Sequence, residues 1–205
     1  MHLNANEGPV LEDILFFSPL RWEGPFCRPH HVACRWAATH RVWFWEEPVD
    51  SQGLDLEIVE RELVTVLVPH LPQSHPDPDE ALSSLLDGWL RTQSPELSIG
   101  WYWAPRMRSF SHQVRFRTIV RDCLDGVAVG HGEHALLEAA HIVFASQPDG
   151  YLARQHLHPN IHLLPDSLRP ERSWEATVGH MKRLVAQATP SGANLQPRRA
   201  QIVAH

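Results

Sequence analysis

The sequence of 205 residues has little lysine and little cysteine, and it has no long run of apolar residues. Lys182 is the only lysine, and a formal net charge of −6 is unlike that of a general nucleic-acid-binding protein, which usually carries a basic face. Cys27, Cys34 and Cys123 form no CxxC pair, which favours reduced thiols over a disulfide framework. No apolar run approaches the roughly 18 residues that a membrane span needs, and residues 1–11 lack the pattern of a signal peptide. We therefore expect a cytoplasmic protein without a transmembrane segment.

Several motifs that mark common enzyme chemistries are also missing. The chain contains no GxGxxG dinucleotide fingerprint and no GxxxxGK[ST] phosphate-binding loop. It has no GxSxG nucleophile motif and no HExxH zinc motif either. These absences disfavour a dehydrogenase, a P-loop NTPase, a serine hydrolase and a zinc protease.

What the sequence does contain is typical of a globular domain. Hydrophobic residues make up 43% and charged residues 20% of the chain, which argues against wholesale disorder. At roughly 150 residues per domain, we expect one domain over residues 13–188. Residues 1–12 are then an N-terminal extension and residues 189–205 a flexible tail.

The order of the expected elements predicts the fold class. Apolar runs indicate strands at 13–17, 41–45, 56–62, 64–71, 99–103, 115–121, 141–145 and 160–164. Apolar stripes indicate helices at 30–39, 79–93, 133–139, 147–155 and 174–188. Strands alternating with helices over short connections predict a doubly wound, mostly parallel Rossmann-like α/β sheet with helices on both faces.

Ligands of such sheets bind beyond the carboxyl ends of the strands, and the first loop placed there is residues 18–31. In it, Arg21, Trp22 and Arg28 are followed by His30 and His31 at the start of a helix. Arginine can clamp phosphate or carboxylate, and Trp22 could stack on a flat ligand. The alternative is that Trp22 and Arg28 pack this loop onto the sheet.

Two further segments fall at the same edge. Glu46 and Glu47 end the second strand, where an acid can hold a ribose hydroxyl or be merely solvated. Asp122 and Asp125 follow the strand at 115–121 and could act as a catalytic base, or as a cap or turn before Gly126.

The 15 histidines suggest metal binding as another alternative. His131, His134 and His141 form an H-x-x-H pattern with a later third histidine. Since His141 begins an expected strand, these three side chains need not converge, and we assign no metal site.

Taken in order, several segments resemble the N-terminal half of bacterial GT-B glycosyltransferases. The closest group is the family 1 or teichuronic-acid-biosynthesis-like enzymes. The resemblance runs from about residue 13 to residue 167 and rests on Ile14–Glu23 (ILFFSPLRWE), Arg28–His31 (RPHH), His40–Pro48 (HRVWFWEEP), Val64–Pro72 (VTVLVPHLP), Trp101–Trp103 (WYW), Asp122–Asp125 (DCLD) and Pro159–His162 (PNIH). The ordered set is fairly specific, whereas each motif alone is weak.

The resemblance implies transfer of a sugar from a nucleotide-sugar to a glycan or lipid acceptor, such as a cell-envelope polysaccharide precursor. In this family an N-terminal Rossmann-like domain binds the acceptor, and a C-terminal one binds the donor nucleotide. It implies no bound cofactor, with the nucleotide-sugar as a substrate. It also implies a location in the cytoplasm, peripheral at the inner face of the membrane.

Two departures from the family pattern qualify this expectation. About 38 residues follow Ser167, too few for a second Rossmann domain, and Gly126 replaces the acid that usually follows the DCLD motif. We therefore expect an acceptor-side domain that is inactive alone, or active with a donor-domain chain or as a homodimer. The alternatives are a non-catalytic α/β module that binds a ligand or protein, and a metal-dependent enzyme built on the histidines.

Overall fold

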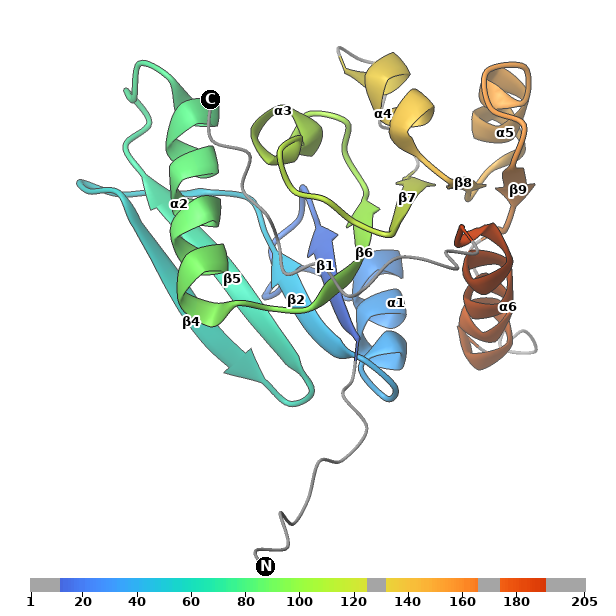
Figure 1. Ribbon diagram of the computed structural model, residues 1–205, viewed down its shortest axis with the longest axis horizontal. Helices are drawn as coiled ribbons and strands as arrows, with labels where there is room; N and C mark the ends of the chain where they lie inside the picture. Colours follow the sequence, from blue (N-terminus) through green and yellow to red (C-terminus); the bar gives the residue numbers. More distant parts are fainter. Residues whose placement is uncertain (1–11, 125–131, 166–173, 191–205) are drawn as a thin grey trace, which may run out of the picture.

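The computed structural model describes residues 12–124, 132–165 and 174–190, and these form one nine-stranded sheet flanked by helices (Figure 1). The strands are β1 (Asp13–Phe17), β2 (Arg41–Trp45), β3 (Val49–Asp50), β4 (Asp55–Arg61), β5 (Val64–Leu71), β6 (Leu97–Tyr102), β7 (Thr118–Cys123), β8 (Ile142–Ala145) and β9 (Ile161–Leu163). The helices are α1 (Arg28–Trp36), α2 (Pro78–Gln93), α3 (Met107–Ser111), α4 (Glu133–Ala139), α5 (Pro148–Arg154) and α6 (Trp174–Ala188).

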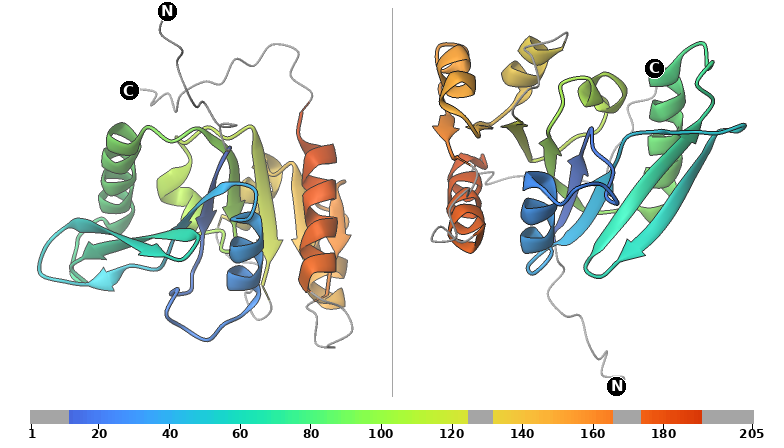
Figure 2. Two further views of the ribbon diagram at one scale, coloured as in Figure 1. Left: turned by 90° about the horizontal axis from the view of Figure 1, so that it is seen from below. Right: turned by 180° about the vertical axis from the view of Figure 1, so that it is seen from behind.

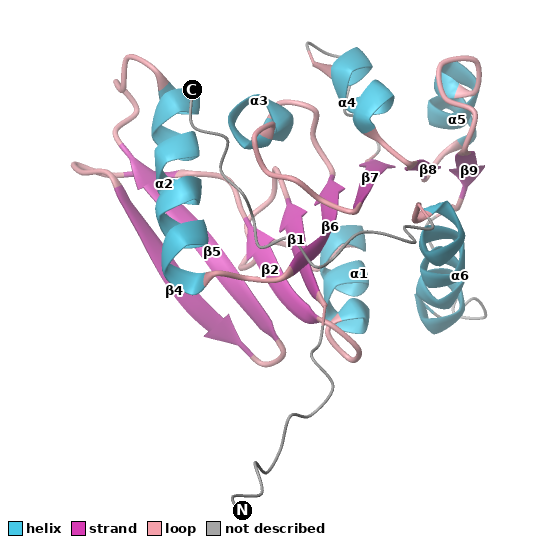
Figure 3. Ribbon diagram, viewed as in Figure 1, coloured by secondary structure: helices cyan, strands magenta, loops and turns pink. Residues whose placement is uncertain are grey.

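The strand order across the sheet is β3-β5-β2-β1-β6-β7-β8-β9, with β4 also paired to β5. Only the β4–β5 pair is antiparallel among the described strands; every other pair is parallel. Strands and helices alternate along most of the chain (Figure 3). The expected mostly parallel Rossmann-like α/β fold is therefore confirmed.

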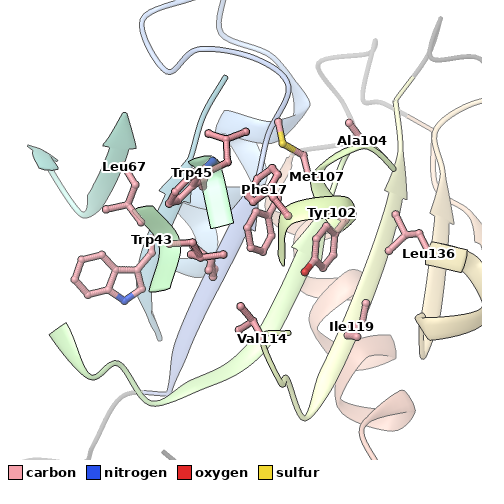
Figure 4. Close-up of a cluster of buried hydrophobic side chains, with 14 of the residues drawn as sticks. Phe17, Trp43, Trp45, Leu67, Tyr102, Ala104, Met107, Val114, Ile119 and Leu136 are labelled. Atoms are coloured by element: carbon pink, nitrogen blue, oxygen red, sulfur yellow. The ribbon is translucent and has the colours of Figure 1, made fainter. Parts of the chain in front are cut away.

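Each central strand is buried on both faces, as a parallel sheet covered by helices requires. In β1 the side chains of Leu15 and Phe17 enter the cluster beneath α2, α3 and α4, which Figure 4 shows around Phe17 and Tyr102. Ile14 and Phe16 point to the opposite cluster, beneath α1 and α6. Figure 1 shows α2 in front of the sheet, and the right view of Figure 2 shows α1 on the other side.

Helix boundaries follow local capping chemistry. The Asp77 carboxylate accepts the Glu80 N–H at 3.0 Å and starts α2, which ends at Ser94 with a left-handed φ of 44°. Helix α1 begins at Arg28, two residues earlier than the pattern predicted, because Cys27 and His30 form a capping box at its start. None of the described helices is long and apolar enough to cross a membrane.

Further elements differ from the sequence-based expectation. No element was expected directly after Pro105 or at 49–50, where the structure has the short helix α3 and the two-residue strand β3. Strand β7 starts at Thr118 and runs to Cys123, so Asp122 lies inside the strand and not after it. A run ending in Arg121 and Asp122 looks like a strand end in sequence, but both charges have buried partners in the fold.

A candidate site at the carboxyl edge of the strands

Parallel strands place the segments predicted to carry function at one edge of the sheet. The loop after β1, the residues after β2 and the end of β7 meet there, together with the start of α1. The left view of Figure 2 shows the loop after β1 and the start of α6 at this same edge. The structure therefore brings the candidate residues together, although their contacts give them different roles.

The loop of residues 18–27 is held in place by hydrogen bonds to residues outside it. The Trp22 N–H donates to Glu46 Oε2 at 2.7 Å, and Arg21 Nη2 donates to the Pro48 carbonyl at 2.8 Å. His30 Nε2 lies 3.0 Å from the Trp22 carbonyl oxygen. Three of the predicted binding residues thus fix the loop that carries Trp22.

His30 is a buried side chain, with 1% of its surface exposed. Its Nδ1 accepts the Cys27 N–H at 3.2 Å, so its proton sits on Nε2 and is donated to the Trp22 carbonyl. Both ring nitrogens are therefore engaged with backbone groups, and His30 ties the loop to the start of α1.

Arg28 and Asp122 form a buried ion pair between α1 and β7. Arg28 Nε lies 3.0 and 3.1 Å from the two carboxylate oxygens of Asp122, and Nη2 lies 2.9 Å from Oδ1. Trp103 Nε1 also donates to Asp122 at 2.9 Å, and Arg28 Nη1 donates to the Leu164 carbonyl. With both side chains buried, the geometry favours packing over ligand binding for Arg28, and Asp122 offers no exposed oxygen to act as a base. Asp125 lies outside the described residues.

A second buried charge cluster on the opposite face of β7 was missed from the sequence. Arg121 Nη2 lies 3.1 Å from Glu133 Oε2, and Arg154 Nε donates to Glu133 Oε1 at 2.8 Å. Because successive strand residues point to opposite faces, Arg121 and Asp122 enter different networks. The sequence feature that could have indicated this cluster is Arg121, an arginine next to the apolar residues of the segment Thr118–Cys123.

Glu46 and Glu47 are neighbours with different surroundings. Glu46 is buried, which raises the pKa of its carboxyl, while the Trp22 N–H and the charge of Arg21 oppose that rise. Glu47 is partly exposed and pairs with Arg106 at 2.7 Å. Glu46 therefore supports the loop, and Glu47 lies at the surface beside α3.

Five rings make a continuous run over the start of α1, here called the aromatic strip: Trp22, His30, Phe26, His31 and Trp174. Their successive ring centroids are 5.0, 5.0, 4.7 and 4.4 Å apart. Phe26 is 61% exposed, and Trp22, His31 and Trp174 are partly exposed. Burial and the nearby Arg35 lower the pKa of His31, which keeps this ring neutral at neutral pH.

The histidines considered for metal binding are not gathered. His134 is exposed and faces Glu138, whereas Nδ1 of His141 accepts the Ile119 N–H at 3.0 Å. His131 lies outside the described residues. Within the described ranges, no three His, Cys, Asp or Glu side chains are grouped to hold a metal ion.

A groove of about 410 Å³ lies between α2 and α3, on the face of the sheet opposite α1. Asp77, Asp79, Glu80 and Asp87 line it together with three serines, Arg91 and His112. The acids occupy the start and exposed side of α2, where negative charge favours the helix. The acidic lining of the groove is therefore accounted for by its stabilising effect on α2, and we assign the groove no function.

No family model and no curated protein sequence matches the chain, but solved structures do. A sucrose-phosphate synthase chain from Thermosynechococcus elongatus superimposes with a TM-score of 0.56 at 13% identity, covering 86% of this chain and 98% of that one. A longer chain of the same synthase gives 0.52 at 14% identity, covering 75% of this chain and 48% of that one. An E. coli trehalose-6-phosphate protein bound with UDP-2-fluoro glucose gives 0.49 at 12%, covering 77% and 50%.

The likeness to the sucrose-phosphate synthase chains concerns the fold. The domain has a Rossmann-like α/β fold that resembles the domains of GT-B glycosyltransferases. It spans about half the length of the longer synthase chains that it matches.

Proposed function

We propose that this chain is the acceptor-side domain of a GT-B-type glycosyltransferase. It would bind a glycan or lipid-linked sugar acceptor at the carboxyl edge of its sheet. The observation that carries the proposal is the superposition of 86% of the chain on nearly all of a sucrose-phosphate synthase chain. The ordered motifs from Ile14 to His162 support the bacterial, teichuronic-acid-like branch of this class, with cell-envelope glycans as products.

The donor in this proposal is a nucleotide-sugar held by a second domain. That domain would be supplied by a partner chain or by a second copy, facing the carboxyl edge. The match to about half of a longer synthase chain supports this division of labour. The protein would then work in the cytoplasm, at the inner face of the membrane where lipid-linked acceptors are found.

A non-catalytic module that binds sugars is the second candidate. It is favoured by one observation: Asp122, the carboxylate best placed to act as a base, is buried and bonded to Arg28 and Trp103. Both candidate functions place the sugar at the same edge of the sheet. They differ in whether a donor-binding domain associates with that edge to complete an active site.

Calorimetric titration of the purified chain with UDP-, GDP- and dTDP-sugars, beside titration with acceptor sugars, tests the proposal. We expect saturable binding of an acceptor sugar and no micromolar binding of any donor. Micromolar binding of one donor would show a complete site on this chain and overturn the need for a second domain. Failure to bind any sugar, donor or acceptor, would overturn both candidates.

A further inference from the structure

The rings of the aromatic strip differ in exposure: His30 is buried, Trp22, His31 and Trp174 are partly exposed, and Phe26 is exposed. Phe26 leaves 61% of its surface in solvent although the rest of its loop is anchored. The strip draws its rings from three places: the loop after β1, the start of α1 and the start of α6. Phe26 and the partly exposed rings beside it form a surface at the edge where ligands of such sheets bind.

The strip is also fixed before any ligand arrives. His30 and Glu46 hold the Trp22 backbone, as described above. The ion pair Arg35–Glu175, at 2.5 Å, joins α1 to α6 beside the stacked rings of His31 and Trp174. Rigid aromatic side chains lose little conformational entropy on binding. A ligand can therefore bind to such a surface with a small entropic penalty.

Among the described residues, arginines next to the strip already have carboxylate partners. Arg28 is bonded to Asp122, Arg35 to Glu175, and Arg61 to Glu23, the neighbour of Trp22. Arg21 donates to the Pro48 carbonyl and lies beside the Glu46 carboxylate. A phosphate bound here would have to draw an arginine away from its carboxylate, which weakens phosphate recognition.

An uncharged sugar chain suits these groups better than a phosphorylated sugar. The C–H face of a pyranose ring is apolar and stacks on an aromatic ring, while its hydroxyls take hydrogen bonds from planar polar groups. Partly exposed Trp22, Phe26 and Trp174 offer the stacking faces, and the exposed carboxylate of Glu175 offers acceptors at one end. Several stacking faces on one surface favour a chain of sugars over a single unit.

We infer that the aromatic strip binds an uncharged oligosaccharide as the acceptor, with Phe26 as its main contact. The inference rests on the proposed function, because it names the acceptor that the domain would present. It assigns Phe26 and Trp174 to the site, two residues that the motif-based prediction did not include.

Calorimetric titration with chitotetraose, cellotetraose and maltotetraose, and with glucose 6-phosphate, tests the inference. We expect saturable binding of at least one tetrasaccharide and weaker binding of the sugar phosphate. Phe26→Ala should lower the tetrasaccharide affinity about tenfold, since one stacked face is lost. Its melting temperature should stay within about 2 °C of wild type, because Phe26 is largely exposed.

Leu54→Ala is the matched control. Leu54 is an exposed apolar residue, 45% accessible, next to β4 at the outer edge of the sheet. This variant should bind the tetrasaccharide as wild type does.

Three outcomes would overturn the inference. Tetrasaccharide binding that is unchanged in Phe26→Ala would remove the strip from the site. Binding of glucose 6-phosphate in preference to every tetrasaccharide would reject an uncharged acceptor while leaving the acceptor-domain proposal standing. Absence of binding by all four sugars would reject both.

Discussion

At the scale of single residues, the charged side chains at the carboxyl edge divide into those that hold the fold and those that face solvent. Arg28 and Asp122 belong to the first group, since both are buried and each is the main partner of the other. The motif Arg-Pro-His-His drew attention to Arg28 as a ligand clamp, and its contacts favour the packing alternative.

Arg28→Ala should lower the free energy of unfolding by about 3–5 kcal/mol, because it leaves the Asp122 carboxylate buried without its cation. Urea denaturation measures this loss. Arg106→Ala removes an exposed pair with Glu47 and should cost no more than about 1 kcal/mol. A near-wild-type stability for Arg28→Ala, together with lost sugar binding, would restore the ligand role.

Glu46 should make the stability of the protein depend on pH. Burial raises the pKa of its carboxyl in the folded state, so the folded protein holds this proton more tightly than the unfolded chain does. The resulting stabilisation is complete below the unfolded pKa of about 4.3 and is lost as pH rises through the folded pKa.

Glu46→Gln removes this titration and keeps an oxygen that can accept the Trp22 N–H. The variant should therefore gain stability relative to wild type as the pH rises from about 4.3, the unfolded pKa, through the raised pKa of the folded state. Urea midpoints measured across that range test this. Glu47→Gln serves as the partly exposed control, and parallel curves for Glu46→Gln and wild type would contradict the prediction.

At the scale of elements, strong apolar patterns were sufficient to predict where several strands and helices begin and end. Strands β1 and β2 and helices α4 and α6 have the bounds that the sequence predicts, because each combines a clear pattern with a clear stop. The five-residue helix α3 was missed, since so short an element has no periodicity to detect. Strand β7 was placed too early because Arg121 and Asp122 look like a strand end without their partners.

Helix α6 closes one face of the sheet although it lies last among the described elements. Met181 is fully buried there with Val178 and Val185, against α1 and the sheet. Lys182 Nζ also donates to the Arg35 carbonyl at 3.0 Å, which fastens α6 to α1.

Met181→Ala should lower the free energy of unfolding by about 2–5 kcal/mol through loss of buried contacts and the cavity left behind. Because α6 covers the core, near-ultraviolet and far-ultraviolet circular dichroism should report the same lowered urea midpoint. Arg183→Ala, exposed on the same helix, should stay within about 0.5 kcal/mol of wild type. A separate early loss of helical signal would instead mean that α6 unfolds on its own.

At the scale of the whole molecule, one property follows from parallel pairing. The strand order β5-β2-β1-β6-β7-β8-β9 brings the ends of β1, β2 and β7 to one edge. Sequence reasoning placed the loops there because the rule for parallel sheets needs only the order of elements. Sequence reasoning could not identify which of these side chains would form buried contacts within the fold.

The sequence by itself determined the α/β class, the approximate place of most elements and the edge of the sheet at which the candidate residues lie, because these depend on local patterns and chain order. Tertiary structure alone decided what each side chain does at that edge. Arg28 and Asp122, 94 residues apart in sequence, become a buried pair. Trp174 reaches His31 from the other end of the domain to complete the aromatic strip. Such partners are distant along the chain, and only folding brings their atoms within reach.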